Sequence, residues 1–425
     1  MAGTRNRWRA RDWALLLGGL AAAGLIRALL LPTEGLRGDI DQFVRWVHGI
    51  AGAPLGEAYR MNLSFPPVMV YVFAFLSAIE PAFRTVTDGS DPAIRTLMKL
   101  PATLADFGLA ALVAWVLRDR PRWAVGAALA VLLTPAVFYD SAWWGQFESI
   151  YTLSGLTAVA FALSGRDRAA AALLAVSLMT KPQAFPFLVP FAAWFLARHG
   201  LRGSVPLALV GAAVAALLWL PFIADGGPGR YLGSLAGYQG DVFAVLSLRA
   251  WNLWWLVQEA YGGGSFLSDG GAIIGPLTPR FIGLSVTALL ELVVFLAVLR
   301  APSGRTLVLG LTASVLVAFA FLTTMHERYA YAALVFGALL LADRVVRPGW
   351  VALATVVSLN LVAASPPTRQ LATLLPISGP LGAAGAVVIL AITAVTLILL
   401  VRDSAAGGHD LPAAPGGLTE SGVAP

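Results

Sequence analysis

Two carboxylates, Asp39 and Asp41, stand two residues apart in the stretch GDIDQFVRW, residues 38–46. This stretch predicts a short helix that begins at Asp39. Side chains two positions apart on a helix point in different directions, so the two carboxylates are not expected to share one proton. One could act as a general base toward a hydroxyl group while the other caps the helix or holds a cation. Capping alone is the alternative, because aspartate is favoured in the first helical turn.

Basic side chains that suit an anion occur in two further stretches, MHERYAY and MTKPQAFPFLVP. In the first, the guanidinium of Arg328 offers fork-shaped donors for a phosphate, and His326 can donate to the same group. Glu327 would hold Arg328 in place, and a solvated loop end with an internal ion pair is the alternative. In the second, Lys181 lies between two short apolar runs, where it either snorkels to the surface or binds an anion.

Two aromatic stretches mark helix ends at a membrane interface. In WWGQFES (143–149), tryptophans are common at that depth, but Gln146 and Glu148 are less expected at the start of a span. In SLRAWNLWWLVQEAYG (247–262), the tryptophans and Arg249 predict an amphipathic helix that lies in the interface. Such a helix either cradles a lipid or anchors its loop.

The composition is that of an integral membrane protein. Of the 425 residues, 58% are hydrophobic and only 12% are charged, whereas about a quarter of a soluble domain is charged. Apolar stretches of about 20 residues recur, which predicts an all-α, polytopic transmembrane bundle of about 12–13 spans rather than a barrel. The absence of cysteine excludes disulfides and thiolate metal sites. The net charge of +6 comes from basic residues in short loops, which indicates topology rather than nucleic-acid binding.

Charge also predicts the orientation of the chain. Residues 1–12 are basic and are expected in the cytoplasm, followed by a single transmembrane domain over 13–401 and a disordered cytoplasmic tail over 402–425. The basic loops between spans all fall on the cytoplasmic side if the short run 65–79 does not cross the membrane. We therefore predict that this run is re-entrant or interfacial, and a true crossing is the alternative.

Two external segments are long enough to contribute to a site. A first external loop covers residues 32–95 and a second covers 224–280, and long connections of this kind are usually functional. The polar clusters fall on the same predicted extracytoplasmic face: Asp39, Asp41, Glu148, Lys181 and His326–Arg328. Convergence of charge on one face is what a single active site needs.

The order of these motifs resembles the GT-C class of membrane glycosyltransferases. The Gly-Asp of the first external loop, a Pro-Pro pair, WGQFES, TKPQ, NLWW and HERY follow one another as in the bacterial branch that uses polyprenyl-phosphate sugars. The eukaryotic glucosyltransferases that extend the lipid-linked oligosaccharide have a similar order. The DID stretch also resembles the Asp-x-Asp of the GPI-anchor mannosyltransferase. The resemblance covers about residues 35–332 and departs at Glu148, where the bacterial proteins commonly have aspartate.

The resemblance implies an enzyme that moves a hexose, mannose or glucose, from a polyprenyl-phosphate-linked donor to an acceptor hydroxyl on the extracytoplasmic face of the cell membrane. The acceptor would be a glycolipid, a glycan or a protein, and the reaction would invert the anomeric carbon. Asp39 matches the general base, with Asp41 as its competitor. No metal or other cofactor is expected, and Mg or Mn at Asp39 and Asp41 is the minority alternative.

The resemblance also assigns the remaining residues. The donor phosphate would be bound by Lys181, His326 and Arg328, and more weakly by Arg249. Other residues would line the sugar site: Trp144, Gln146, Glu148, Gln183, Asn252 and Glu327. A lipid or solute transporter, or flippase, is the alternative function. It would need charged or broken segments at the midplane in matched halves, and the sequence shows no internal repeat.

Overall fold

The computed structural model describes residues 8–408, except 242, 264 and 274. The regular secondary structure of the described residues is helical apart from two strands of two residues each, which confirms the all-α prediction. Residues 1–7 and 409–425, which include most of the expected N-terminal segment and tail, lie outside the described residues. The last helix continues to Ala405, so the first four residues of the predicted tail, 402–405, are helical.

Within the described residues, seven helical segments are long and apolar enough to cross a membrane. They are α1 (Ala10–Leu30), α4 (Pro92–Val116), the continuous unit of η4 (Pro182–Phe187), α9 (Leu188–Trp219) and η5 (Leu220–Phe222), α12 (Pro279–Arg300), α13 (Gly304–Phe321), α15 (Val346–Ala364) and α17 (Pro380–Ala405). The chain is therefore a multi-pass helical membrane protein.

Shorter helices account for the difference from the twelve to thirteen spans predicted. They are α3 (Pro67–Ile79), α5 (Pro121–Leu133), α6 (Pro135–Phe138), η3 (Tyr139–Trp144), α7 (Glu148–Leu163), α8 (Asp167–Leu178) and α14 (Tyr331–Ala338). The described part has eight spans if α5 and the bent segment after it count as one. A helix rises about 1.5 Å per residue, so segments of 12–16 residues fall short of a bilayer core of about 30 Å. The segment α9 itself consists of two helices joined by a kink at Gly200, whose φ is +64°.

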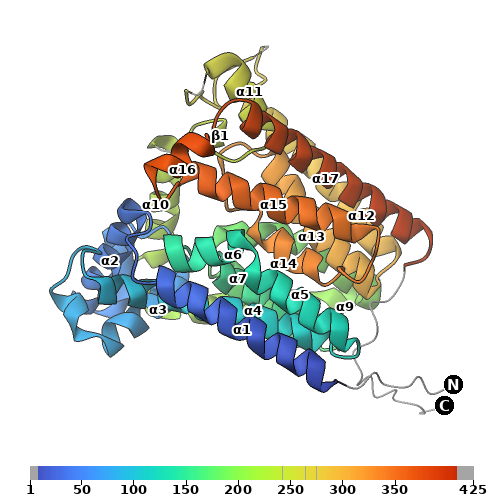
Figure 1. Cartoon of the computed structure of the whole chain (residues 1–425), viewed down its shortest axis with the longest axis horizontal. Helices are drawn as coiled ribbons and strands as arrows, with labels where there is room; N and C mark the ends of the chain where they lie inside the picture. Colours follow the sequence, from blue (N-terminus) through green and yellow to red (C-terminus); the bar gives the residue numbers. More distant parts are fainter. Residues whose placement is uncertain (1–7, 242, 264, 274, 409–425) are drawn as a thin grey trace.

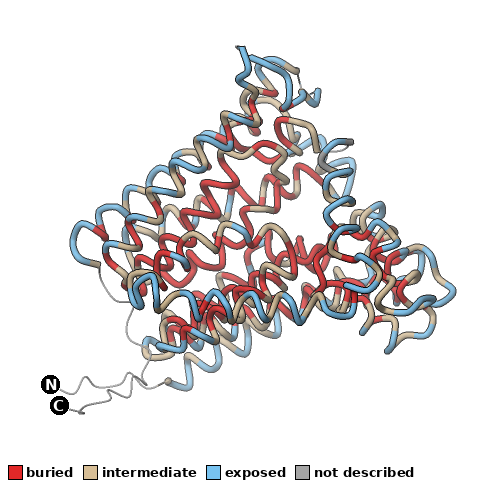
Figure 2. The backbone as a smooth tube through the Cα atoms, turned by 180° about the vertical axis from the view of Figure 1, so that it is seen from behind, coloured by how far each residue is buried: buried red, intermediate tan, exposed pale blue. Residues whose placement is uncertain are grey.

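Helices α13 and α14 form the centre of the bundle. All eight residues of α14 are buried, and α13 is buried along most of its length. Helices α12 and α17 pack against α13, and α7 and α15 pack against α14, so the buried backbone lies in the interior of the bundle (Figure 2). The outer helices instead expose leucines such as Leu25, Leu209 and Leu289, as expected of faces that contact lipid.

A lobe built from residues 32–95 projects from one end of the bundle, at the left of Figure 1. It contains α2 (Arg37–Gly52), η1 (Leu55–Met61), α3 and η2 (Pro81–Arg84). Helix α2 is amphipathic, and its apolar side packs into a second core that includes Phe43, Trp46 and Phe73. This packing fixes the first turn of α2, which carries Asp39, against the rest of the molecule.

Residues 224–280 run from beside the lobe to the top of the molecule in Figure 1. They contain α10 (Gly227–Asp241), β1 (Ser247–Leu248) and α11 (Leu253–Gly262), and α16 (Arg369–Leu374) lies near α10. Strand β1 pairs in parallel with β2 (Met325–His326). This pairing joins the segment to the MHERYAY stretch, which is distant in sequence.

Candidate active site

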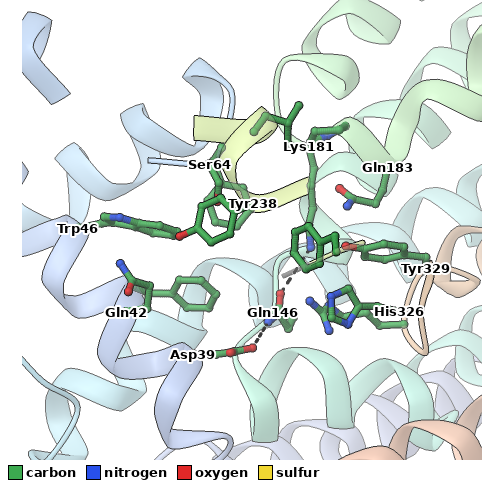
Figure 3. Close-up of a pocket in the computed structure, with 16 residues that line it drawn as sticks. Asp39, Gln42, Trp46, Ser64, Gln146, Lys181, Gln183, Tyr238, His326 and Tyr329 are labelled. Carbon is green, nitrogen blue, oxygen red and sulfur yellow. Dashed lines mark hydrogen bonds between the residues drawn. The ribbon is translucent and has the colours of Figure 1, made fainter. Parts of the chain in front are cut away.

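A cavity of about 210 Å³ lies between the lobe, α10 and the loop that follows β2. Figure 3 shows the polar and aromatic side chains that face it. Six of the residues expected at a site line it: Asp39, Gln146, Lys181, Gln183, His326 and Arg328. Three more contact these lining residues: Trp144 hydrogen-bonds to Asp39, Glu148 pairs with Lys181, and Glu327 pairs with Arg328.

Asp39 is held by two hydrogen bonds to one of its oxygens. The indole Nε1 of Trp144 donates to Oδ2 at 2.9 Å, and the amide Nε2 of Gln146 donates to the same atom at 2.6 Å. Both donors come from the turn that ends η3, so one short segment orients the carboxylate. The second oxygen, Oδ1, lies outside these two bonds.

The turn itself requires glycine at position 145. Gly145 has φ +89°, and a Cβ there would lie 2.4 Å from Cδ1 of Ile40 and 3.1 Å from Cγ of Lys99. Only glycine adopts this conformation without strain and fits this gap. The close approach brings Trp144 and Gln146 against the first turn of α2, where Asp39 lies.

Asp41 points to a different neighbour. Its Oδ1 accepts a hydrogen bond from the backbone N–H of Gly89 at 2.8 Å, and its Oδ2 lies 3.6 Å from Nε of Arg37. Asp41 does not line the cavity. Because the two aspartates face different partners, they do not form a common cation site, and we do not propose Mg or Mn between them.

Lys181 forms a buried ion pair behind the cavity wall. Its Nζ lies 2.5 Å from Oε1 of Glu148 and 3.5 Å from Oε1 of Gln146. Lys181 has an extended backbone ahead of Pro182, as expected of a residue before proline. The break in helical structure there turns the lysine toward Gln146 (Figure 3).

Arg328 joins this ion pair from the loop after β2. Its Nε lies 3.3 Å from the same Oε1 of Glu148, and its Nη1 donates to Oε1 of Glu327 at 2.8 Å. Its guanidinium also stacks near the rings of Trp144 and Tyr329, 5.2 Å and 5.5 Å from their centroids, a favourable cation–π arrangement. Oε1 of Glu148 therefore contacts both Lys181 and Arg328.

His326 stands at the edge of this group. Its Nδ1 lies 3.7 Å from Oε2 of Glu327, and its ring meets Tyr329 edge-on. Burial and the charge of Arg328 lower the pKa of the His326 imidazole. Burial opposes the ionisation of Glu327, but its contacts with His326 and Arg328 outweigh that effect and lower its pKa to about 2.

Two residues expected at the site lie elsewhere. Arg249 is exposed, has a positive φ of 67°, and donates from Nη1 to the carbonyl of Ala364 at 2.8 Å. Asn252 is buried as the N-cap of α11, where it accepts from the backbone of Trp255 at 3.0 Å. Neither lines the cavity, and both have the contacts of structural residues.

Sequence reasoning missed Asp140 and the aromatic wall. Asp140 is fully buried in η3, and neither carboxylate oxygen has a hydrogen-bond partner among the described residues. A lone aspartate inside the apolar run PAVFYDSAWW was the available signal. Phe65 and Tyr238 line the cavity from segments with no distinctive motif, so no pattern could have identified them.

Comparisons with known proteins give a structural likeness. No protein-family model matches the chain, and no curated protein sequence matches it. The chain is similar in structure to ArnT from Cupriavidus metallidurans, solved with undecaprenyl phosphate bound. The TM-score is 0.48 at 15% sequence identity, and the likeness covers 94% of this chain and 78% of that one.

Proposed function

We propose that this chain is a membrane glycosyltransferase of the GT-C class, which moves a hexose from a polyprenyl-phosphate-linked donor to an acceptor hydroxyl. One observation carries the proposal. Asp39, oriented through Oδ2, faces the same cavity as Lys181 and Arg328. Glycosyl transfer from a phosphate needs a base for the attacking hydroxyl and positive donors for the departing phosphate.

The reaction follows from these positions. Oδ1 of Asp39 takes the proton of the acceptor hydroxyl as its oxygen bonds to the anomeric carbon of the donor sugar. The bond between that carbon and the phosphate oxygen breaks, and the oxygen keeps the electron pair. Lys181 and Arg328 stabilise the negative charge on the polyprenyl phosphate that leaves. Attack opposite the leaving group inverts the anomeric carbon.

The place of Lys181 supports a lipid-linked donor. Lys181 directly precedes the membrane-span candidate Pro182–Phe222, so a phosphate bound to it lies where a bilayer presents its head groups. Residues of the lobe and of α10 line the cavity together with residues of the bundle. A phospholipid head enters such a site from the membrane while its chain stays in lipid.

The rest of the cavity suits a sugar. Gln42 and Gln183 offer amide groups to hydroxyls, and Tyr238 and Phe65 offer apolar faces. We propose mannose or glucose as the transferred hexose and a glycolipid, glycan or protein as the acceptor. We also propose that the cavity opens to the extracytoplasmic face, because the basic loops lie between the other ends of the spans.

Incubation of the purified protein with a panel of radiolabelled polyprenyl-phosphate hexoses tests this function. We expect label to move from one donor to an acceptor lipid or glycan, with release of polyprenyl phosphate. Asp39→Asn serves as the inactive control. Movement of the intact donor between leaflets without any cleavage would instead show a flippase and contradict the proposal.

A further inference from the structure

A second buried carboxylate, Asp106 of α4, lies deeper in the bundle than the cavity. It is fully buried, as are Ser141 and, to within 1%, Arg27 and Tyr331. An ionisable side chain at membrane depth is costly and is functional by default. Asp106 does not line the cavity, so the mechanism above does not use it.

Asp106 accepts hydrogen bonds from three other elements. Arg27 of α1 donates to Oδ2 from Nε at 3.1 Å and from Nη2 at 2.8 Å. Ser141 of η3 donates to the same oxygen at 2.5 Å, and the hydroxyl of Tyr331, at the start of α14, donates to Oδ1 at 3.0 Å. Oδ2 therefore bonds to α1 and η3, and Oδ1 bonds to α14. The carboxylate of α4 connects these three elements to its own helix.

Ser141 belongs to η3, which ends at Trp144. Trp144 and Gln146, two residues further on, donate the hydrogen bonds that hold Asp39. Ser141 lies in the six-residue π-helix Tyr139–Trp144, and π-helical turns are rare and frequently occur at functional sites. The backbone N–H groups of Gly145 and Gln146 donate to the carbonyl of Asp140, the residue before Ser141, at 3.0 and 2.9 Å. The bond from Ser141 to Asp106 therefore fixes the turn that presents Trp144 and Gln146.

Tyr331 is the first residue of α14. The helix begins directly after residues 327–330, the loop that contains Arg328. The backbone N–H of Tyr331 donates to the carbonyl of Arg328 at 2.9 Å. Its hydroxyl bond to Asp106 anchors this end of the loop to α4. The bond from Arg27 fixes α1, whose C-terminal end leads within a few residues into α2 and Asp39.

We propose that Asp106 is a positioning residue that sets the distance between the base Asp39 and the cation Arg328. This inference rests on the proposed function for its catalytic meaning. A buried ion pair adds little net stability, but it fixes a unique arrangement when every lone pair is satisfied. Through Ser141 the carboxylate positions Trp144 and Gln146, which orient Asp39. Through Tyr331 it positions the loop after β2, which contains Arg328.

Two conservative variants separate this role from a structural one. Ser141→Ala and Tyr331→Phe each remove one hydrogen bond to the same carboxylate. We expect Ser141→Ala to lower kcat about tenfold with little change in affinity for polyprenyl phosphate. We expect Tyr331→Phe to weaken binding of polyprenyl phosphate about tenfold with a smaller change in kcat.

A matched control comes from the opposite end of the bundle. There Asp167, also buried, accepts a hydrogen bond from the indole of Trp194 at 3.3 Å. Trp194→Phe removes one donor from a buried carboxylate, as the other two variants do. We expect it to leave both kcat and the affinity for polyprenyl phosphate unchanged.

A spectroscopic readout makes the test independent of sugar transfer. In protein labelled with 5-fluorotryptophan, the ¹⁹F resonance of Trp144 is assigned by its loss in Trp144→Phe. We expect Ser141→Ala to shift this resonance and Trp194→Phe to leave it in place. If no donor is turned over, the proposed function fails, and the resonance still decides the role of Asp106. An unshifted resonance in Ser141→Ala, or equal effects of Ser141→Ala and Tyr331→Phe on kcat and affinity, overturns the proposal.

Discussion

Gln146 contacts both halves of the candidate site with one side-chain amide. Its Nε2 donates to Oδ2 of Asp39 at 2.6 Å, and its Oε1 lies 3.5 Å from Nζ of Lys181. A side-chain amide donates through its NH₂ group and accepts through its oxygen, so it can bond to a carboxylate and to an ammonium at the same time. The residue thereby links the position of the base to that of the phosphate-binding lysine.

Replacing Gln146 tests this link. Gln146→Leu removes both contacts at similar volume, so Asp39 loses one of its two orienting bonds. We expect kcat to fall about tenfold, less than the roughly 10²–10⁴-fold contribution of a general base, because one bond to Asp39 remains while the fold is kept. Gln42→Leu is the matched comparison, because Gln42 lines the same cavity without a bond to Asp39; as a proposed sugar contact it should raise KM rather than lower kcat. Equal losses in the two variants would mean that Gln146 only shapes the cavity.

The two aspartates of α2 should differ sharply on substitution. Asp39→Asn removes the proton acceptor and should reduce sugar transfer by roughly 10²–10⁴-fold, the usual contribution of a general base. Asp41→Asn should keep transfer and cost about 1 kcal/mol of stability, because its hydrogen bond to Gly89 weakens. Transfer rates and thermal unfolding of the detergent-purified variants measure both. Retained transfer in Asp39→Asn, with loss in Asp41→Asn, would move the base.

The buried pair of Lys181 and Glu148 should show strong coupling in a double-mutant cycle. Glu148→Leu leaves Lys181 buried without its counter-charge and should cost about 3–5 kcal/mol, and Lys181→Met is the other single variant of the cycle. Lys181→Met combined with Glu148→Leu removes both charges and should recover most of that stability. The double variant should still fail to bind polyprenyl phosphate. Additive stability effects would show that the pair is not coupled.

Acid should destabilise the loop after β2 through His326 and Glu327. Both pKa values are lowered in the folded protein, so the unfolded chain binds more protons and stability falls as the pH falls. The His326 contribution is complete above its ordinary pKa of about 6.5 and is lost below it. The Glu327 contribution is lost between its ordinary value of 4.5 and about 2.

Melting temperatures measured against pH separate the two groups. His326→Gln should flatten the curve just below about pH 6.5, and Glu327→Gln should flatten it below 4.5. The two variants are compared window by window, because the two side chains contact each other and each affects the pKa of its partner. A His326→Gln curve parallel to that of the unsubstituted protein would exclude the histidine as a source of acid sensitivity.

The face to which the cavity opens is open to a labelling test. The chain has no cysteine, so Gln42→Cys and Gln183→Cys each introduce a unique thiol beside the cavity. We expect an impermeant maleimide to label both from outside intact cells. Arg166→Cys, on an exposed loop expected in the cytoplasm, should react only after permeabilisation. The opposite pattern would reverse the predicted orientation.

The membrane character and the all-helical class are properties that the sequence determines by itself. Runs of apolar residues force helices in a bilayer, because every backbone hydrogen bond must close within the segment. The polar residues that interrupt those runs are equally visible, so Asp39, Lys181, His326 and Arg328 could be selected without a structure. The number of spans could not be predicted as well, because α7 and α8 are apolar but short.

Only the tertiary structure decided which of these polar residues meet. Asp39 and Asp41 are equivalent in the sequence, and the packing of α2 turns one to the cavity and the other to Gly89. The sequence predicted Arg249 as a phosphate ligand. In the structure its backbone is left-handed, and its side chain donates to the carbonyl of Ala364. The bonds of Asp106 to Arg27 and Tyr331 join positions 79 and 225 residues apart. Local patterns carry no information about such contacts, because they form only when distant helices pack together.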